Sequence, residues 1–194
     1  MKGTHNSLTY ARPTKWWMRL LTPIFRCQSK NIDAQLDAGA EAFDIRIVRH
    51  RNADGIYCWR GAHGLVTLDV DPLKVIERIC SRRVKPYIRI VLERGNADDA
   101  RRFACLCETL EVVHPDVVFF GGVLKNGWKR QYEFERHPLE ARRAEALLIQ
   151  HVGAMSKSWW GRILPRLWAR RNRRNIPWQA ESTRNHPIVF LDFI

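Results

Sequence analysis

The sequence predicts an α/β protein in which helices cover a mainly parallel sheet. Short runs of β-branched and aromatic residues alternate with helical patterns, the order expected when each strand is followed by a crossover helix. The chain has 194 residues, 45% of them apolar, which suits a single domain spanning residues 1–194. A complete eightfold (βα) barrel takes about 250 residues, so a barrel of this length would be small, incomplete or irregular in its second half.

Five segments have the composition of strands. They are the residues up to Ser7, Ala42–Val48, Pro86–Glu93, Asp116–Val123 and Pro187–Ile194. Because strand side chains alternate with a period of two, Asp44 and Arg46 are expected on one face of the second strand.

Three helices are expected between these strands. Ser29 is placed to cap a helix that carries Ile32, Gln35 and Leu36 and ends at Gly39, and a second follows the apolar spacing of Leu73, Ile76 and Ile79. A third helix begins near Asp98 and Asp99, whose charges suit a helix N-terminus. The region 127–185 is expected to form loop and basic helix.

The net charge of +13 predicts attraction to a polyanion, with nucleic acid and anionic membrane both open. Thirteen Lys or Arg against four Glu lie between Lys125 and Asn175, and tryptophans accompany them. We therefore expect a basic, tryptophan-rich helical segment at about 138–175. No apolar run approaches the roughly 20 residues of a spanning helix, which excludes a transmembrane protein.

Five scattered cysteines do not suggest a disulfide framework, and we expect them to be reduced, small buried side chains. The N-terminal segment has no apolar core of a secretory signal. We expect a cytoplasmic or peripheral-membrane location, or secretion if the natural chain starts upstream of Met1.

Two of the seven histidines stand out. His5 follows Gly-Thr in GTHNS at the end of the first strand, and His63 lies in GAHG, where glycine lets the backbone approach a ligand closely. Two histidines with a pKa near neutral can act as general base and general acid. Arg46 suits a phosphate, although Asp44 and Arg46 could equally pair with each other. Asp192, on an apolar strand, needs a partner, and a histidine would serve.

These motifs resemble the phosphatidylinositol-specific phospholipase C-like phosphodiesterases of the X-domain type. The resemblance is carried by GTHNS, LDAGAEAFDIR, the His63-Gly64 pair and the terminal VFLDFI, over roughly the first 95 residues and the last eight. It implies a distorted TIM-type barrel and phospholipid cleavage by a histidine pair. His5 would deprotonate the attacking hydroxyl, His63 would protonate the leaving oxygen, and Asp192 would orient His5.

The resemblance also implies how the phosphate is held. In the bacterial form of the Asp-Ile-Arg motif the arginine occupies the place of the calcium ion of the eukaryotic enzymes, so Arg46 implies chemistry without a metal cofactor. Asn6 and Glu93 depart from the bacterial pattern toward the calcium-dependent one, which leaves calcium as the less favoured alternative. Asn6, Glu93 and Lys125 are expected to bind substrate.

Tryptophan pairs flanked by basic residues predict docking on an anionic membrane surface through Trp16, Trp17, Trp159 and Trp160. The prediction is therefore a phosphodiesterase acting on a phospholipid or related phosphodiester. The alternative is a non-catalytic membrane- or nucleic-acid-binding protein on a degenerate barrel. A weaker third interpretation is a metal-dependent barrel phosphodiesterase that acts on sphingomyelin or glycerophosphodiesters.

Overall fold

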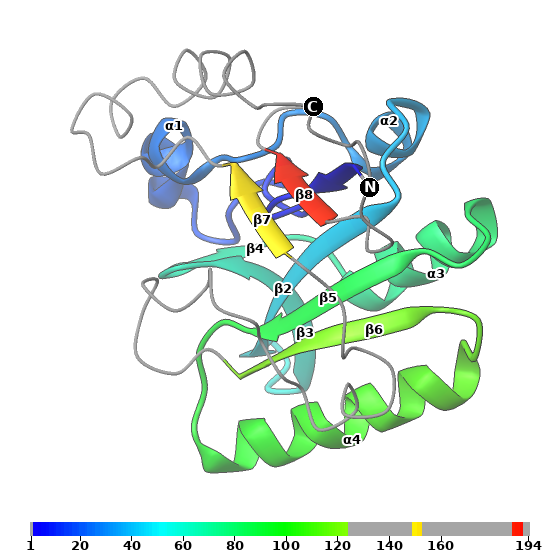
Figure 1. The fold of residues 1–194 in the computed structure, drawn as a ribbon. Helices are drawn as coiled ribbons and strands as arrows, with labels where there is room; N and C mark the ends of the chain where they lie inside the picture. Colours follow the sequence, from blue (N-terminus) through cyan, green and yellow to red (C-terminus); the bar gives the residue numbers. More distant parts are fainter. Residues whose placement is uncertain (1, 124–148, 153–187, 192–194) are drawn as a thin grey trace.

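The computed structural model describes residues 2–123, 149–152 and 188–191 and shows a mixed α/β fold (Figure 1). Eight strands join in one sheet, with neighbours in the order β4-β3-β2-β1-β8-β7 and with β5 lying between β2 and β6. The bounds are β1 Lys2–Thr4, β2 Ala42–Arg51, β3 Tyr57–His63, β4 Val66–Leu68, β5 Tyr87–Leu92, β6 Val118–Val123, β7 Ile149–Val152 and β8 Ile188–Leu191.

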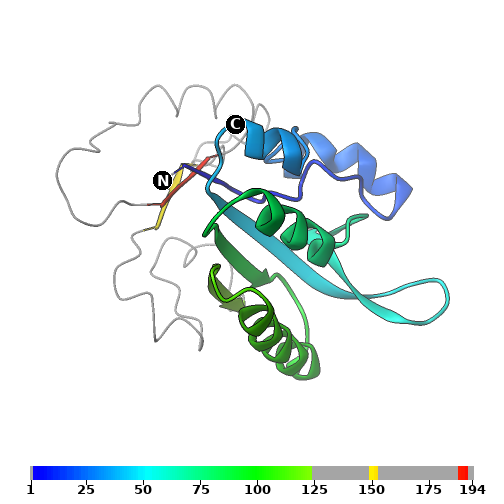
Figure 2. The same ribbon diagram turned by 90° about the vertical axis from the view of Figure 1, so that its right-hand side faces the viewer.

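Among the named strands, pairing is parallel except in two successive hairpins, β2–β3 and β3–β4. β1 pairs with β2 and β8, β5 pairs with β2 and β6, and β7 pairs with β8, all in parallel. β3 returns antiparallel to the second half of β2, and β4 turns back to pair antiparallel with β3. Figure 2 shows the β2–β3 hairpin projecting to one side. In the described part of the chain β6 and β7 are not paired, so the sheet is not closed into a barrel there.

The helices within the described ranges are η1 Trp16–Leu21, a 3₁₀ helix, and four α-helices: α1 Thr22–Phe25, α2 Ile32–Asp37, α3 Pro72–Arg82 and α4 Ala97–Val113. The Asn96 side chain and Asp99 form a reciprocal capping box at the start of α4, which satisfies the first backbone N–H groups. α4 packs against β5 and β6. No helix among the described residues is long and apolar enough to cross a bilayer.

The strands β2 and β5 divide the core into an apolar and a charged face. Phe43, Ile45 and Ile47 alternate with Asp44 and Arg46 along β2, and all are buried. The apolar face belongs to the hydrophobic core together with residues of α3 and α4. The opposite face buries ionisable side chains, which is costly unless they are paired.

Several sequence predictions need correction. Asn31, not Ser29, caps α2, with its side chain accepting a hydrogen bond from the Ala34 N–H. The β3–β4 hairpin departs from the mainly parallel sheet that the sequence predicts, because the antiparallel return of β3 depends on pairing with the end of β2. Strand β7 lies inside a region expected to be loop and basic helix. The second strand extends beyond Val48, because its half-exposed end pairs with β3.

Candidate functional site

The turn after β1 is fixed to β2 through Asp44. The Asn6 backbone N–H donates to Asp44 Oδ2 at 3.1 Å, and the Ser7 N–H donates to the Asp44 carbonyl at 2.9 Å. Asn6 has a φ of 47°, a left-handed conformation that asparagine tolerates better than most residues. These contacts hold His5, at the end of β1, beside Asp44.

Asp44 anchors two buried arginines. Its Oδ2 accepts from Arg46 Nε at 3.1 Å, and its Oδ1 accepts from Arg89 NH1 at 2.8 Å. Burial alone would raise the pKa of Asp44, but Arg46 and Arg89 hold that pKa well below its usual 3.8. Arg46 also donates from NH1 to Glu93 Oε2 at 3.3 Å. The pairing of Asp44 with Arg46, which the sequence left open as an alternative to phosphate binding, is therefore present within a larger charge network.

His5 presents an unprotonated Nε2 to the site. Arg46 NH2 lies 3.0 Å from His5 Nε2, and because a guanidinium only donates, this ring nitrogen accepts. Burial, followed by the positive charge of Arg46, holds the pKa of His5 well below 6.5. Near neutral pH, His5 can therefore accept a proton at Nε2.

His63 faces the same point from the end of β3. Its Nδ1 lies 2.7 Å from the Phe25 carbonyl oxygen, which only accepts, so Nδ1 carries a proton. Its Nε2 lies 3.1 Å from Asn6 Nδ2, and Asn6 Nδ2 is also 3.1 Å from His5 Nε2. The two rings lie edge to face with centroids 6.5 Å apart. Both histidines thus converge on one amide.

Glu93 joins the His63 turn to this network. Its Oε1 accepts from the Gly64 N–H at 2.7 Å, while its Oε2 accepts from Arg46. The guanidinium of Arg46 thereby lies between two carboxylates that could otherwise face a cation. Among the described residues no group of three or more His, Cys, Asp or Glu side chains is placed to hold a metal ion.

The structure brings together six of the sequence-selected residues: His5, Asn6, Asp44, Arg46, His63 and Glu93. Trp16 and Trp17 are exposed on η1, with 75% and 46% of their surface accessible. Asp192, Lys125, Trp159 and Trp160 lie outside the described residues, as does the expected basic segment at about 138–175 apart from β7.

Sequence reasoning missed two residues of the network, Arg89 and Cys27. Arg89 alternates with the apolar residues of β5 and lies in register with Asp44, so a charged residue within an apolar strand was the available signal. Cys27 was interpreted only as a small buried side chain, yet its sulfur lies 3.3 Å from Asn6 Nδ2. The position of Cys27 depends on the path that the chain takes through η1 and α1, and the residue pattern of this segment does not predict that path.

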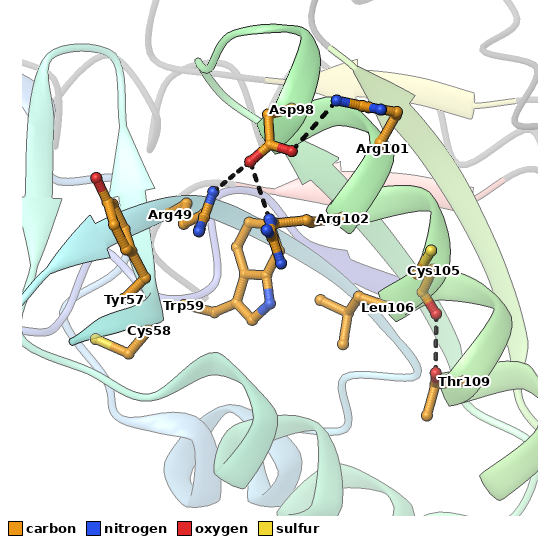
Figure 3. Close-up of a pocket in the computed structure, with 10 residues that line it drawn as sticks. All are labelled: Arg49, Tyr57, Cys58, Trp59, Asp98, Arg101, Arg102, Cys105, Leu106 and Thr109. Carbon is orange, nitrogen blue, oxygen red and sulfur yellow. Dashed lines mark hydrogen bonds and ion pairs between the residues drawn. The ribbon is translucent and has the colours of Figure 1, made fainter.

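A separate pocket of about 550 Å³ lies between the β2–β3 hairpin and α4 (Figure 3). Within it Asp98 pairs with Arg49 at 2.8 Å, Arg102 at 2.9 Å and Arg101 at 3.5 Å. The lining residues are Arg49, Tyr57, Cys58, Trp59, Asp98, Arg101, Arg102, Cys105, Leu106 and Thr109. His5 and His63 are not among them, so this pocket is distinct from the histidine site.

The fold and site define an α/β protein with paired imidazoles at the ends of β1 and β3 and a guanidinium anchored on β2, which lies between these two strands. Among the solved structures with a similar fold are bacterial phosphatidylinositol-specific phospholipases C. The enzyme from Listeria monocytogenes superposes with a TM-score of 0.65 at 15% identity, covering 100% of this chain and 87% of that chain. A variant of the enzyme from Staphylococcus aureus gives 0.56 at 11% identity, covering 100% and 84%.

No family model matches the chain, and no curated protein is significantly similar in sequence. At these identities the likeness is one of fold. The resemblance inferred from the sequence motifs is confirmed at that level, because similar solved structures include the phospholipases that the motifs indicated.

Proposed function

We propose that this protein is a phosphodiesterase resembling phosphatidylinositol-specific phospholipase C, which cleaves a phospholipid or related phosphodiester. The observation that carries the proposal is the convergence of His5 Nε2 and His63 Nε2 on Asn6, with Arg46 NH2 at 3.0 Å from His5. A base, an acid and a fixed positive charge at one point are what phosphodiester cleavage requires. The likeness in fold to the bacterial phospholipases supports it.

In the proposed reaction, His5 Nε2 takes the proton of an attacking hydroxyl as its oxygen bonds to phosphorus. The bond from phosphorus to the leaving oxygen breaks, and that oxygen receives a proton from Nε2 of His63 in its protonated form. Arg46 stabilises the negative charge on the phosphate oxygens. The described strands would form part of a small or incomplete distorted barrel, whose charged inner face supplies these groups.

The chain's own residues supply the positive charge, so we propose that the reaction needs no metal cofactor. The pKa of the Arg46 guanidinium is raised. Burial alone would lower this pKa, but the negative charges of Asp44 and Glu93 together have the larger effect. A divalent cation between Asp44 and Glu93 would have to displace this guanidinium, against electrostatic repulsion.

We expect the protein to release a water-soluble phosphate product from anionic phosphatidylinositol vesicles in buffer containing EDTA. His63→Ala should reduce this rate about 10²-fold or more, because the alkoxide leaving group then departs without a proton. His50→Ala, on β2 but outside the contacts described above, is the matched control and should retain the wild-type rate. The rate is measured as the release of water-soluble radioactivity from vesicles whose phosphatidylinositol headgroup is radiolabelled.

Three outcomes would contradict parts of this proposal. Wild-type activity in His63→Ala would remove the acid role, and a rate restored only by calcium would show a metal-dependent enzyme. Vesicle or RNA binding without hydrolysis of any phosphodiester would favour the non-catalytic alternative.

We propose that η1 and α1 form a membrane-docking surface. Trp16 and Leu20 are 75% and 81% exposed, and Trp17, Leu21 and Ile24 are also exposed. Lys15 Nζ lies 5.9 Å from the centroid of the Trp17 ring, so a positive charge accompanies the aromatics. Exposed apolar side chains beside basic residues are suited to an anionic bilayer surface.

Replacing Trp16 and Trp17 together by alanine should weaken binding to anionic vesicles about tenfold or more, because each buried aromatic contributes roughly 1.5–3 kcal/mol. Vesicle sedimentation measures the affinity. Val84→Ser, which alters an exposed apolar residue between α3 and β5, is the control and should bind as the wild type does. Unchanged binding of the double tryptophan variant would place the docking surface elsewhere.

A further inference from the structure

The side-chain amide of Asn6 has an uneven set of partners. Its Nδ2 lies within hydrogen-bonding distance of three atoms: His5 Nε2, His63 Nε2 and Cys27 Sγ, at 3.1, 3.1 and 3.3 Å. Its Oδ1 is buried and has no hydrogen-bond partner among the residues that the structure describes. A buried carbonyl without a donor is costly, so this orientation suits only one state of the site.

The orientation depends on where protons lie. With both Nε2 atoms unprotonated, each ring presents a lone pair, and the NH2 of Asn6 is the appropriate partner. Once one histidine Nε2 carries a proton, its N–H and the NH2 group of Asn6 would be two donors facing each other. A half-turn about the Cβ–Cγ bond exchanges Nδ2 and Oδ1, and the oxygen then accepts from the protonated ring.

We propose that Asn6 is a positioning residue whose amide turns with the proton, presenting Nδ2 to unprotonated histidines and Oδ1 to a histidine that carries a proton at Nε2. The inference rests on the proposed acid–base roles of His5 and His63. It assigns Asn6 to the histidine pair, in addition to the substrate contact expected from the sequence.

On the His63 side of the pair, the surroundings suit both orientations of the amide. The Phe25 carbonyl, 2.7 Å from His63 Nδ1, stabilises His63 whether or not Nε2 is protonated, because Nδ1 donates in both forms. Cys27 Sγ lies 3.7 Å from the same carbonyl oxygen, so the thiol can donate to it while its sulfur accepts from Asn6 Nδ2. After a half-turn, the thiol can instead donate to Asn6 Oδ1.

The proton count balances through the proposed reaction. His63 gives up a proton at Nε2 while His5 gains one, so one imidazolium is present before and after the step. Before and after the step, Oδ1 of Asn6 can accept from whichever ring carries the proton, and Nδ2 faces the pair when neither ring is protonated. Among the described residues, the charged and titratable groups that face the pair are Asp44 and Arg46 on β2, Arg89 on β5, Glu93 directly after β5, and the Cys27 thiol.

The decisive measurement uses the wild-type protein labelled with ¹⁵N in its histidine rings and asparagine side chains. We expect the Asn6 NH2 resonances to shift with pH at the same apparent pKa as the histidine pair, since the amide turns as the pair is protonated. Asn6 NH2 resonances that stay constant while the histidine rings titrate would overturn the inference.

A variant provides a second test. Aspartate at position 6 also tolerates the left-handed backbone, but its ionised side chain only accepts hydrogen bonds. Asn6→Asp should therefore raise the upper apparent pKa of the histidine pair by about one unit or more, a tenfold gain in proton affinity. The acid limb of kcat/KM should move to higher pH by the same amount. Asn52→Asp adds the same charge in the β2–β3 turn and should leave both values unchanged. An unchanged histidine pKa in folded Asn6→Asp would contradict the proposal.

The two proposals fail separately. The titrations need no turnover, so coupled titration without hydrolysis of any phosphodiester would remove the proposed function alone. Hydrolysis by the wild type with an inert amide would remove this inference alone. If Asn6→Asp fails to fold, the wild-type amide resonances still decide the matter.

Discussion

His5→Ala will lose about 10²–10⁴-fold in kcat/KM on phosphatidylinositol, and it will lose as much on a phosphodiester with a p-nitrophenol leaving group. The reason is that a general base acts on the attacking hydroxyl, whatever group departs. His63→Ala should differ, because p-nitrophenolate leaves without a proton, and this variant should recover most of its rate on the activated substrate. Initial rates on the two substrates measure the difference.

The pH profile gives an independent check on His5. Burial and the positive charge of Arg46 lower the pKa of His5, so this base becomes protonated only at a pH well below 6.5. The acid limb of kcat/KM assigned to this base should therefore lie below 6.5. The assigned roles would be contradicted if His5→Ala and His63→Ala responded alike to the p-nitrophenol substrate. An acid limb above pH 6.5 would also contradict them.

Asp44→Asn will destabilise the protein by about 3–5 kcal/mol, the usual cost of breaking a buried ion pair. The carboxylate contacts Arg46 and Arg89, and the exposed fraction of its side chain is 0%. An asparagine of the same size keeps the packing and removes the charge that compensates both guanidinium groups. Urea unfolding measures the change, and Asp54→Asn in the β2–β3 turn is the control, expected within about 0.5 kcal/mol of wild type.

The lowered pKa of Asp44 also predicts that the free energy of unfolding decreases in acid. Because the pKa of Asp44 is lower in the folded chain than the usual 3.8, ionised Asp44 stabilises the fold above that pH. This stability is lost as pH falls below about 4 toward the folded-state pKa, and Asp44→Asn should lack this part of the pH dependence. Equal stability of wild type and Asp44→Asn at neutral pH would show that the arginines find other compensation.

The α/β class and most parallel strands could be predicted, because they depend on local hydrophobic periodicity. Ala42–Val48 is a buried run, and the structure confirms a strand there. The β3–β4 hairpin escaped prediction because its antiparallel return depends on pairing with the end of β2. The cap of α2 was misplaced by two residues, from Asn31 to Ser29, because both types of side chain can cap a helix.

The sequence by itself determined the kinds of groups available: two histidines in glycine-containing motifs, and Asp44 and Arg46 on one strand face. A period of two places neighbours on a face without long-range information. Only the tertiary structure decided that Arg89 shares Asp44, that Glu93 joins Arg46 to Gly64, and that Asn6 Nδ2 contacts both histidines and Cys27. These contacts join residues far apart in the chain, so their geometry depends on strand register and on the path of η1 and α1.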